Sequence, residues 1–316
     1  MFYIIIVKLN VEIKMNIKLS VLVCRITFFF CTLSFFITGE IIETRSIKTM
    51  LPFINRESLI FLNIDGVLYA PFNELGGHRW KEYFSEKVKD STDDQELACK
   101  FIDQIKNQII NKIPKKNIEE IAPRLIDYLQ ENKIVVLGMI PKQMSTSYAA
   151  NFAEIIRQHL FSLNIHFEKT LKYLPIPKVN KHNDGNEKST FSFAYGIVFT
   201  NRQPIGPTLL SFLKKSGKQP INVVVIDHSR EALESAQESF DSAGISFTGI
   251  LYGDADDRKD LDLTLGTVEF LSFIKEGQIL SDKEALQTMP QDRSLDYDAL
   301  LDKYIEENLI LEAHRV

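Results

Sequence analysis

The chain has 316 residues, of which 45% are hydrophobic and 25% are charged, a composition typical of globular proteins. Its formal net charge is −5 at pH 7. A broad nucleic-acid surface needs an excess of lysine and arginine, so this balance argues against nucleic acid as a partner. The length suffices for one large domain with an insertion and terminal extensions.

The amino terminus differs in kind from the rest of the chain. Residues 19–39 form an apolar run that is interrupted by one charge, Arg25. We expect residues 1–40 to act as a signal peptide that directs export to the periplasm, the cell surface or the medium. A membrane anchor formed by residues 19–39 is the alternative, although a charge in mid-span costs roughly 2.5–3.5 kcal/mol on insertion scales. A start at Met15 instead of Met1 would give the signal its usual length and basic beginning.

Cysteine usage separates the same two parts of the chain. Cys24 and Cys31 lie inside the apolar run, which leaves Cys99 alone in the remainder. The remainder therefore offers neither an internal disulfide nor a cysteine-rich metal site. Export without disulfides is compatible with a chain that is long enough to bury a sizeable core.

From residue 56 onward, apolar runs of strand length alternate with stretches of helical periodicity. This alternation predicts an α/β fold with three Rossmann-like layers, in which helices cover both faces of a parallel sheet. We expect a core over residues 56–260, a small helical cap inserted at about 76–116, and a helical tail over 261–316. In chain order the predicted elements are strand 58–62, cap helices within 80–113, helix 117–133, strand 134–140, helix 145–163, strand 196–200, helix 207–218, strand 221–227, helix 229–244 and strand 245–253.

Polar residues follow two of the predicted strands where each strand ends. In parallel sheets of this kind, ligands bind beyond the carboxyl ends of the strands. Asn63 and Asp65 follow the first strand, and Asp227 and His228 follow the strand VVVI. Because Asn63 and Asp65 are two residues apart, both can face one site, in which phosphate chemistry would require two aspartates.

Four stretches of the chain, in order, resemble the motifs of the haloacid dehalogenase-like (HAD) superfamily: IFLNIDGVLY, IVVLGMI, GIVFT…PIG and VVVIDHSREAL. The resemblance covers roughly residues 56–257. The HRW loop, the long helical insert and the GILYG strand are similar to an exported bacterial HAD-like family of unknown function, of the DUF2608 type. This resemblance implies a Rossmann-like fold and, in active members, magnesium-dependent phosphoryl hydrolysis through an aspartyl-phosphate.

The resemblance assigns catalytic and metal positions to the residues after the first and fourth motif strands. Asn63 stands at the nucleophile position, where an amide oxygen is far less reactive than a carboxylate. Asp65 stands at the acid/base position and is intact. Asp227 stands at the Mg²⁺ position, with Asn63 as a weak second ligand, and His228 follows where a second acid is usual. We therefore expect weak Mg²⁺ binding at most.

The positions that the resemblance assigns to phosphate binding are also altered. Gly138 stands after the second motif strand, where threonine or serine is expected, and Ser145 and Thr146 are hydroxyls further along. Ile205 stands where the third motif has a lysine. Arg202 could substitute as the cation, although an arginine in such a loop is more often simply solvated.

Several of these residues also have a purely structural interpretation. Asp65 suits a turn and Asp227 suits a helix N-cap, because aspartate is common at both. Trp80 and Phe84 in the cap are expected to pack in its core, and the charged run at 254–260 is expected to be solvated. Only the joint placement of the two aspartates at strand ends favours a remnant active site.

We expect an exported protein of the phosphohydrolase fold that is catalytically impaired, a pseudoenzyme that binds a phosphorylated small molecule or an unknown protein partner. The simultaneous change at all four motifs supports this expectation, because losing one transition-state contact alone costs about 10²–10³-fold in rate. One alternative is a divergent Mg²⁺-dependent phosphatase that uses Asp65 and Asp227. The other is a membrane-attached interaction protein, with the membrane reached only through the amino-terminal segment.

Overall fold

The structure is a computed structural model that describes residues 39–142, 151–174, 191–253, 263–290 and 295–314. Several predicted features lie outside these residues: the signal or anchor up to residue 38, the hydroxyls Ser145 and Thr146, and the charged run 254–260. Within the described residues, no helix is both long enough and apolar enough to span a membrane.

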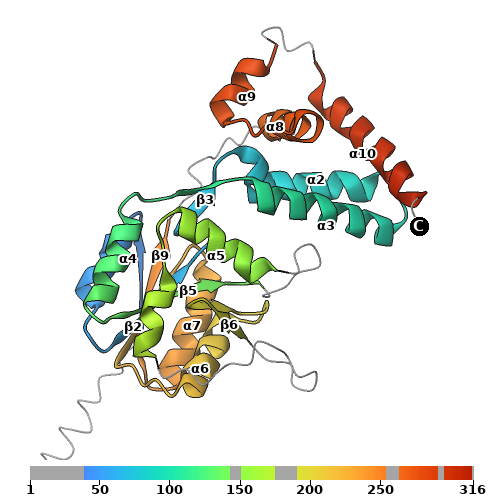
Figure 1. The fold of residues 1–316 in the computed structure, drawn as a ribbon. Helices are drawn as coiled ribbons and strands as arrows, with labels where there is room; N and C mark the ends of the chain where they lie inside the picture. Colours follow the sequence, from blue (N-terminus) through green and yellow to red (C-terminus); the bar gives the residue numbers. More distant parts are fainter. Residues whose placement is uncertain (1–38, 143–150, 175–190, 254–262, 291–294, 315–316) are drawn as a thin grey trace, which may run out of the picture. The chain divides into compact units, whose positions relative to one another are not determined.

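Seven strands of the described residues form one sheet (Figure 1). Neighbouring strands are parallel except at one edge, where β6 and β7 are antiparallel. The prediction of an α/β fold with a mostly parallel, Rossmann-like sheet is confirmed. Across the sheet the strands are β1 (Glu40–Thr44), β9 (Ser246–Tyr252), β8 (Asn222–Asp227), β2 (Ser58–Asn63), β5 (Val135–Ile140), β7 (Ile197–Phe199) and β6 (Ser192–Ala194).

The central strand β2 explains why the sheet is covered on both faces. All six of its residues are buried, as expected for a parallel strand between two helical layers. Its side chains alternate between two cores: Ile60 and Leu62 enter one hydrophobic cluster, and Leu59 and Phe61 enter another. The first cluster is covered by α4 (Ala122–Glu131) and α5 (Phe152–Ser162), and the second by α6 (Ile205–Ser216) and α7 (Arg230–Ser242).

The sheet begins earlier than the sequence predicted. We expected the core to start at residue 56, whereas β1 adds residues 40–44 as an edge strand against β9. Glu119 ties the following segment to the sheet, because its carboxylate accepts hydrogen bonds from the Ile47 backbone nitrogen (2.6 Å) and the Tyr252 hydroxyl (3.0 Å). The described residues also form the short 3₁₀ helices η1 (Ile47–Phe53), η2 (Glu74–Gly76) and η3 (Phe167–Tyr173), of which η1 directly follows β1.

The helices inserted after β2 pack with the carboxyl-terminal helices. A two-stranded ribbon, β3 (Tyr69–Pro71) with β4 (Lys115–Asn117), brackets α2 (His78–Asp90) and α3 (Gln95–Lys112). These two helices share a hydrophobic cluster with α8 (Leu263–Glu276) and α10 (Tyr297–Ala313), and we call these four helices the helical layer (Figure 1). The small helix α9 (Asp282–Thr288) packs beside α8.

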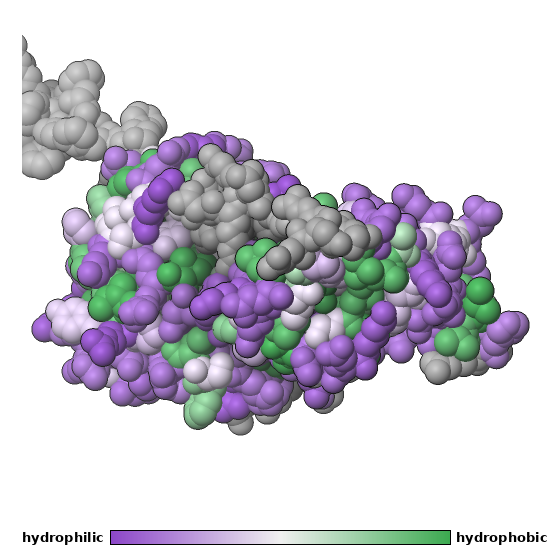
Figure 2. Space-filling model, turned by 90° about the horizontal axis from the view of Figure 1, so that it is seen from above, coloured by the Kyte–Doolittle hydropathy of each residue, from purple (hydrophilic) through white to green (hydrophobic). Residues whose placement is uncertain are grey.

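Aromatic side chains form the centre of the helical layer. Trp80 and Phe84 are each 1% exposed, and their rings stack with centroids 5.3 Å apart. Phe270 of α8 lies 5.0 Å from Trp80, measured between ring centroids. The expected packing role of Trp80 and Phe84 is therefore confirmed, and the tail that we predicted as separate completes the core of the cap. On the face shown in Figure 2, apolar residues are interspersed among hydrophilic ones.

Candidate functional site

The carboxyl ends of β2, β5 and β8 bring the predicted residues to one edge of the sheet. In the parallel register, Asn63 is level with Met139 of β5, and Leu62 is level with Ile226 of β8. Asp227 is the last residue of β8 and so lies at the same edge as Asn63. The structure thus places these two residues on adjacent strand ends.

Asn63, Asp227 and His228 form a compact hydrogen-bonded group, which we call the amide corner. The Asn63 side-chain nitrogen donates to His228 Nδ1 over 3.2 Å, and this ring nitrogen lies 3.5 Å from Asp227 Oδ1. The same carboxylate oxygen accepts a hydrogen bond from the backbone nitrogen of Ser229, the N-cap of α7, over 2.8 Å. Asn63 and Asp227 are each 1% exposed, whereas half of the His228 side chain is in solvent.

Burial dominates the electrostatics of Asp227. It raises the pKa of the carboxyl group above its usual value, because the charged form loses solvation. Hydrogen bonds from Ser229, from Asn63 and from the His228 backbone, together with the His228 ring, partly oppose this shift. The amide corner therefore disfavours the charged form of its one carboxyl group.

The donor set of the amide corner is a poor match to Mg²⁺. Asn63 Oδ1 and Asp227 Oδ2 are buried without a hydrogen-bond partner, so two oxygen atoms are available. Only one of them belongs to a carboxylate, while Mg²⁺ in proteins is usually bound through one or two carboxylates together with phosphate oxygens and water. The amide nitrogen of Asn63 is not a metal ligand, and it is hydrogen-bonded to His228. Among the described residues, no group of three or more histidine, cysteine, aspartate or glutamate side chains could hold a metal ion.

Asp65 lies among three lysines, and these four residues form the lysine corner. Lys142, just beyond the end of β5, places its Nζ 3.2 Å from Asp65 Oδ2. Lys115 of β4 places its Nζ 5.9 Å from the centre of the Tyr69 ring, and Tyr69 is bridged to Asp65 through the backbone. Lys81 of α2 is close enough for its charge to act on Asp65, Lys115 and Lys142.

The lysines control the protonation of this corner. Burial would raise the pKa of Asp65, but Lys142, Lys115 and Lys81 outweigh it and lower the pKa to about 2. Burial also lowers the pKa of Lys81 to about 7, and the charges of Lys115 and Lys142 act in the same direction. At neutral pH, Asp65 is therefore ionised and Lys81 is partly deprotonated.

A tight turn after β2 joins the two corners. The backbone nitrogens of Leu68 and Tyr69 both donate to the Ile64 carbonyl oxygen, over 3.2 Å each. Gly66 in this turn has φ +80°, and a Cβ atom there would lie 3.1 Å from His228 Nδ1. Glycine is favoured because it adopts positive φ without strain and leaves room for the imidazole ring.

The chain matches the sequence model of the family described as "Protein of unknown function (DUF2608)" over residues 40–286. It belongs to the DUF2608 family. The match begins at the first residue of β1 and ends inside α9, so it includes the whole sheet and both corners.

One curated relative of this DUF2608 protein is the "Uncharacterized protein RP296" of Rickettsia prowazekii (strain Madrid E). The two are 20% identical over 261 residues, which span 78% of this chain and 89% of the relative. No solved structure matches the chain.

Two predicted phosphate positions of the DUF2608 protein have packing roles instead. We predicted that the second motif strand ends at Gly138; this is wrong, because β5 continues to Ile140 and Gly138 is level with Leu62 in mid-strand. A Cβ atom at Gly138 would lie 2.8 Å from the Phe167 ring. Ile205 begins α6 and is 6% exposed within the hydrophobic cluster of that face.

The predicted substitute cation, Arg202, does not join the lysine corner. It is exposed in the loop after β7, with φ 64°. The charges that lower the pKa of Asp65 come from the three lysines. The same loop does reach the corner through its backbone, because the Asn201 nitrogen donates to the Lys142 carbonyl oxygen over 3.2 Å.

The three lysines were missed by sequence reasoning. Lys142 follows closely on the predicted strand 134–140, but the resemblance assigned the phosphate position to Gly138 instead. Lys81 and Lys115 gave no local signal, because the β3–β4 pairing and the placement of α2 bring them to Asp65 from distant parts of the chain.

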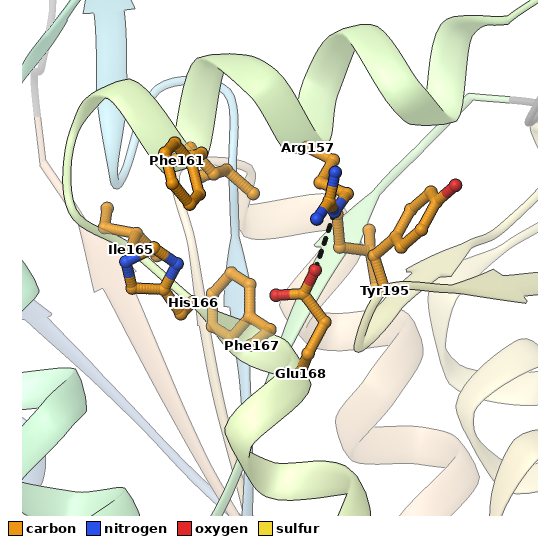
Figure 3. Close-up of a pocket in the computed structure, with 9 residues that line it drawn as sticks. Arg157, Phe161, Ile165, His166, Phe167, Glu168 and Tyr195 are labelled. Atoms are coloured by element: carbon orange, nitrogen blue, oxygen red, sulfur yellow. Dashed lines mark hydrogen bonds and ion pairs between the residues drawn. The ribbon is translucent and has the colours of Figure 1, made fainter.

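A separate surface cavity lies beside α5 and η3 (Figure 3). It encloses about 220 Å³ of empty space, part of it open to solvent, and none of its lining residues belongs to either corner. Arg157 donates from Nε to Glu168 over 2.8 Å across it, and its guanidinium lies 5.0 Å from the centre of the Tyr195 ring. The charges of Arg157 and Glu168, which line the cavity, are therefore paired with each other.

Proposed function

We propose that this DUF2608 protein is an exported protein of HAD-like phosphohydrolase ancestry that no longer hydrolyses phosphoryl groups and keeps the edge of the sheet as a binding site. The proposal is supported by the placement of the stretches that resemble the first and fourth motifs, which meet at Asn63, Asp65 and Asp227. What the site would bind is a phosphorylated small molecule or a protein partner.

The amide corner carries the proposal. In the reaction that the resemblance implies, a carboxylate at position 63 attacks phosphorus. Asn63 has no anionic oxygen, and its amide nitrogen is committed to His228. An amide cannot form the acyl-phosphate and cannot supply the charge that holds the metal.

The state of Asp65 supports the same conclusion. An acid at this position must donate a proton to the leaving group, which requires a pKa close to the working pH. The three lysines lower the pKa of Asp65 to about 2, so the side chain is ionised at neutral pH. A residue in that state can accept a hydrogen bond but is a poor proton donor.

The divergent Mg²⁺-dependent phosphatase remains the competing proposal. It is favoured by the intact Asp65 and by Lys142, whose ammonium group lies where phosphoryl oxygens could be held. It needs a metal that the donor set of the amide corner does not match. The membrane-attached alternative depends on residues 19–39, of which all but the last lie outside the described residues.

A phosphatase assay tests the proposal directly. The full-length chain is incubated with an aryl phosphate and millimolar Mg²⁺, beside the Asp65→Ala variant. We expect equal background rates in the two proteins. A wild-type rate above that of Asp65→Ala, lost again in Asp227→Ala, would establish the divergent phosphatase instead. Fractionation tests the anchor: protein that stays with membranes after a high-salt wash is not exported in soluble form.

A further inference from the structure

The lysine corner collects positive charge from three separate elements. Lys142 follows β5 in the sheet, Lys115 lies in the ribbon strand β4, and Lys81 lies on α2 of the helical layer. All three side chains are half-buried. Lysines at such distances along the chain meet only because the fold brings the helical layer to the carboxyl edge of the sheet.

The charges within this corner do not balance. Among the described residues, three ammonium groups are close enough to act on the one carboxylate of this corner, and they outnumber it when all are ionised. Lys106 of α3 lies near Lys81, but the carboxylates of Asp103 and Glu82 act on it, so it adds little to the surplus. His159 of α5, whose pKa burial lowers to about 4, adds no positive charge at neutral pH. Like charges held together and partly desolvated cost folding free energy, and clusters of this kind are typical of sites that bind an oppositely charged ligand.

We propose that Lys81, Lys115 and Lys142 form a metal-independent binding site for a phosphate-class anion with two or more negative charges. The inference deepens the proposed function, because it names the ligand class of the same edge of the sheet. The ligand would lie beside Asp65 and neutralise the excess charge. None of the three lysines stands at a position that the HAD resemblance assigns to phosphate binding.

The chemistry of the lysines favours this class of ligand. An ammonium group is a compact point charge with three donors, which suits phosphate oxygens approached from several directions. Hydrogen bonds between ionised partners are about twice as strong as neutral ones. The ammonium groups supply the positive charge that Mg²⁺ supplies in active phosphohydrolases, so no metal is needed for binding.

Titration calorimetry of the full-length chain in EDTA tests the site, with orthophosphate and pyrophosphate as the probes. We expect binding to the wild type, and about tenfold or more weaker binding to Lys81→Met and to Lys142→Met, as expected for the loss of one charge-assisted hydrogen bond. Lys89→Met is the matched control, because Lys89 is an exposed lysine on the same helix. It should bind as the wild type does.

Proton uptake provides an independent readout. A bound anion favours the charged form of Lys81, whose pKa is lowered to about 7 in the free protein. Binding near pH 7.5 should therefore take up a fraction of a proton, seen as a binding enthalpy that changes with the ionisation enthalpy of the buffer. Lys81→Met should lose this dependence, and Lys89→Met should keep it.

Three results would each overturn the inference. They are no binding of either probe to the wild type at millimolar concentration, affinities of Lys81→Met and Lys142→Met that both equal that of the wild type, and binding that appears only with Mg²⁺. The wild-type titration decides the first whether or not the variants fold. These results are distinct from failure of the proposed function, which is marked by phosphate release and not by binding.

Discussion

The two corners at the carboxyl edge of the sheet are adjacent and yet have opposite electrostatics. In the amide corner, the single carboxylate is buried beside an amide and an imidazole, and its pKa is raised. In the lysine corner, the carboxylate has a pKa of about 2 and is outnumbered by cations. The comparison teaches that two carboxyl groups at one edge of a sheet can have pKa values shifted in opposite directions, because burial dominates at Asp227 and the lysine charges dominate at Asp65.

The largest expected effect comes from placing a carboxyl group at position 63. Asn63→Asp places a second buried carboxyl group beside Asp227. Solvent does not reach its charge there, and the substitution also removes the amide group that donates a hydrogen bond in the wild type. We expect a loss of roughly 3 kcal/mol in the free energy of unfolding at pH 7. Burial raises the pKa of the new carboxyl group, so the loss, measured by denaturant unfolding, should shrink as the pH falls from 7 and be absent below about pH 4.

Millimolar Mg²⁺ sharpens the same test. Binding to the native state stabilises by mass action, so Mg²⁺ should recover part of the loss in Asn63→Asp and leave the wild type unchanged. Phosphatase activity should not return, because Asp65 is still held ionised by the lysines. An Asn63→Asp protein as stable as the wild type without metal would show that position 63 accommodates a second buried carboxyl group.

A smaller effect is expected from removing the counter-ion of the lysine corner. Asp65→Ala leaves the three lysines without their carboxylate; because 38% of the Asp65 side chain is exposed, solvent screening limits the loss to about 1 kcal/mol at pH 7. The folded-state pKa is lowered, so the wild-type advantage is present above pH 3.8 and is lost as the pH falls towards 2.

Urea unfolding between pH 2 and 7 follows this difference. Asp93→Ala is the control, since Asp93 is an exposed aspartate of a loop, and it should change stability by no more than about 0.5 kcal/mol. In calorimetry, Asp65→Ala should bind pyrophosphate more tightly than the wild type, because the competing carboxylate is gone. Weaker binding would mean that Asp65 helps to hold the ligand.

The smallest effect is expected from Asp227→Asn, which leaves the amide corner without a carboxyl group. The folded-state pKa of Asp227 is raised, so the wild type is most stable at low pH and loses stability as the pH rises above the usual value of 3.8. The variant keeps an acceptor for the Ser229 nitrogen and lacks this loss. We expect it to differ from the wild type by about 1 kcal/mol or less at pH 8 and to converge with it near pH 3. A variant that is much less stable at pH 8 would show that Asp227 is held ionised.

Sequence reasoning succeeded where local pattern and tertiary environment agree. The fully buried strands β2, β5 and β8 are apolar runs of the correct length, and parallel topology then places Asn63 and Asp227 together without further information. It failed at β1, because the sequence EIIET follows an apolar segment and its partner strand begins at residue 246. An edge strand whose pairing is so distant in the chain has no local signal.

The candidate site was predicted only in part for a related reason. Residues that belong to a motif are found by spacing, whereas Lys81 and Lys115 reach Asp65 through the helical insert and the ribbon. Gly138 and Ile205 stand at expected motif positions and were interpreted as losses of phosphate-binding groups. In the structure each is required by packing, against Phe167 and within the core beneath α6.

The helical layer ties the first third of the chain to its last residues. Trp80 and Phe84 are covered by Phe270, and Leu301 and Ile305 lie in the same cluster. During synthesis, the apolar faces of α2 and α3 therefore remain exposed until roughly the last fifty residues have been made. A chain truncated before α8 would contain the complete sheet but would expose the apolar surface around Trp80, which favours aggregation and proteolysis.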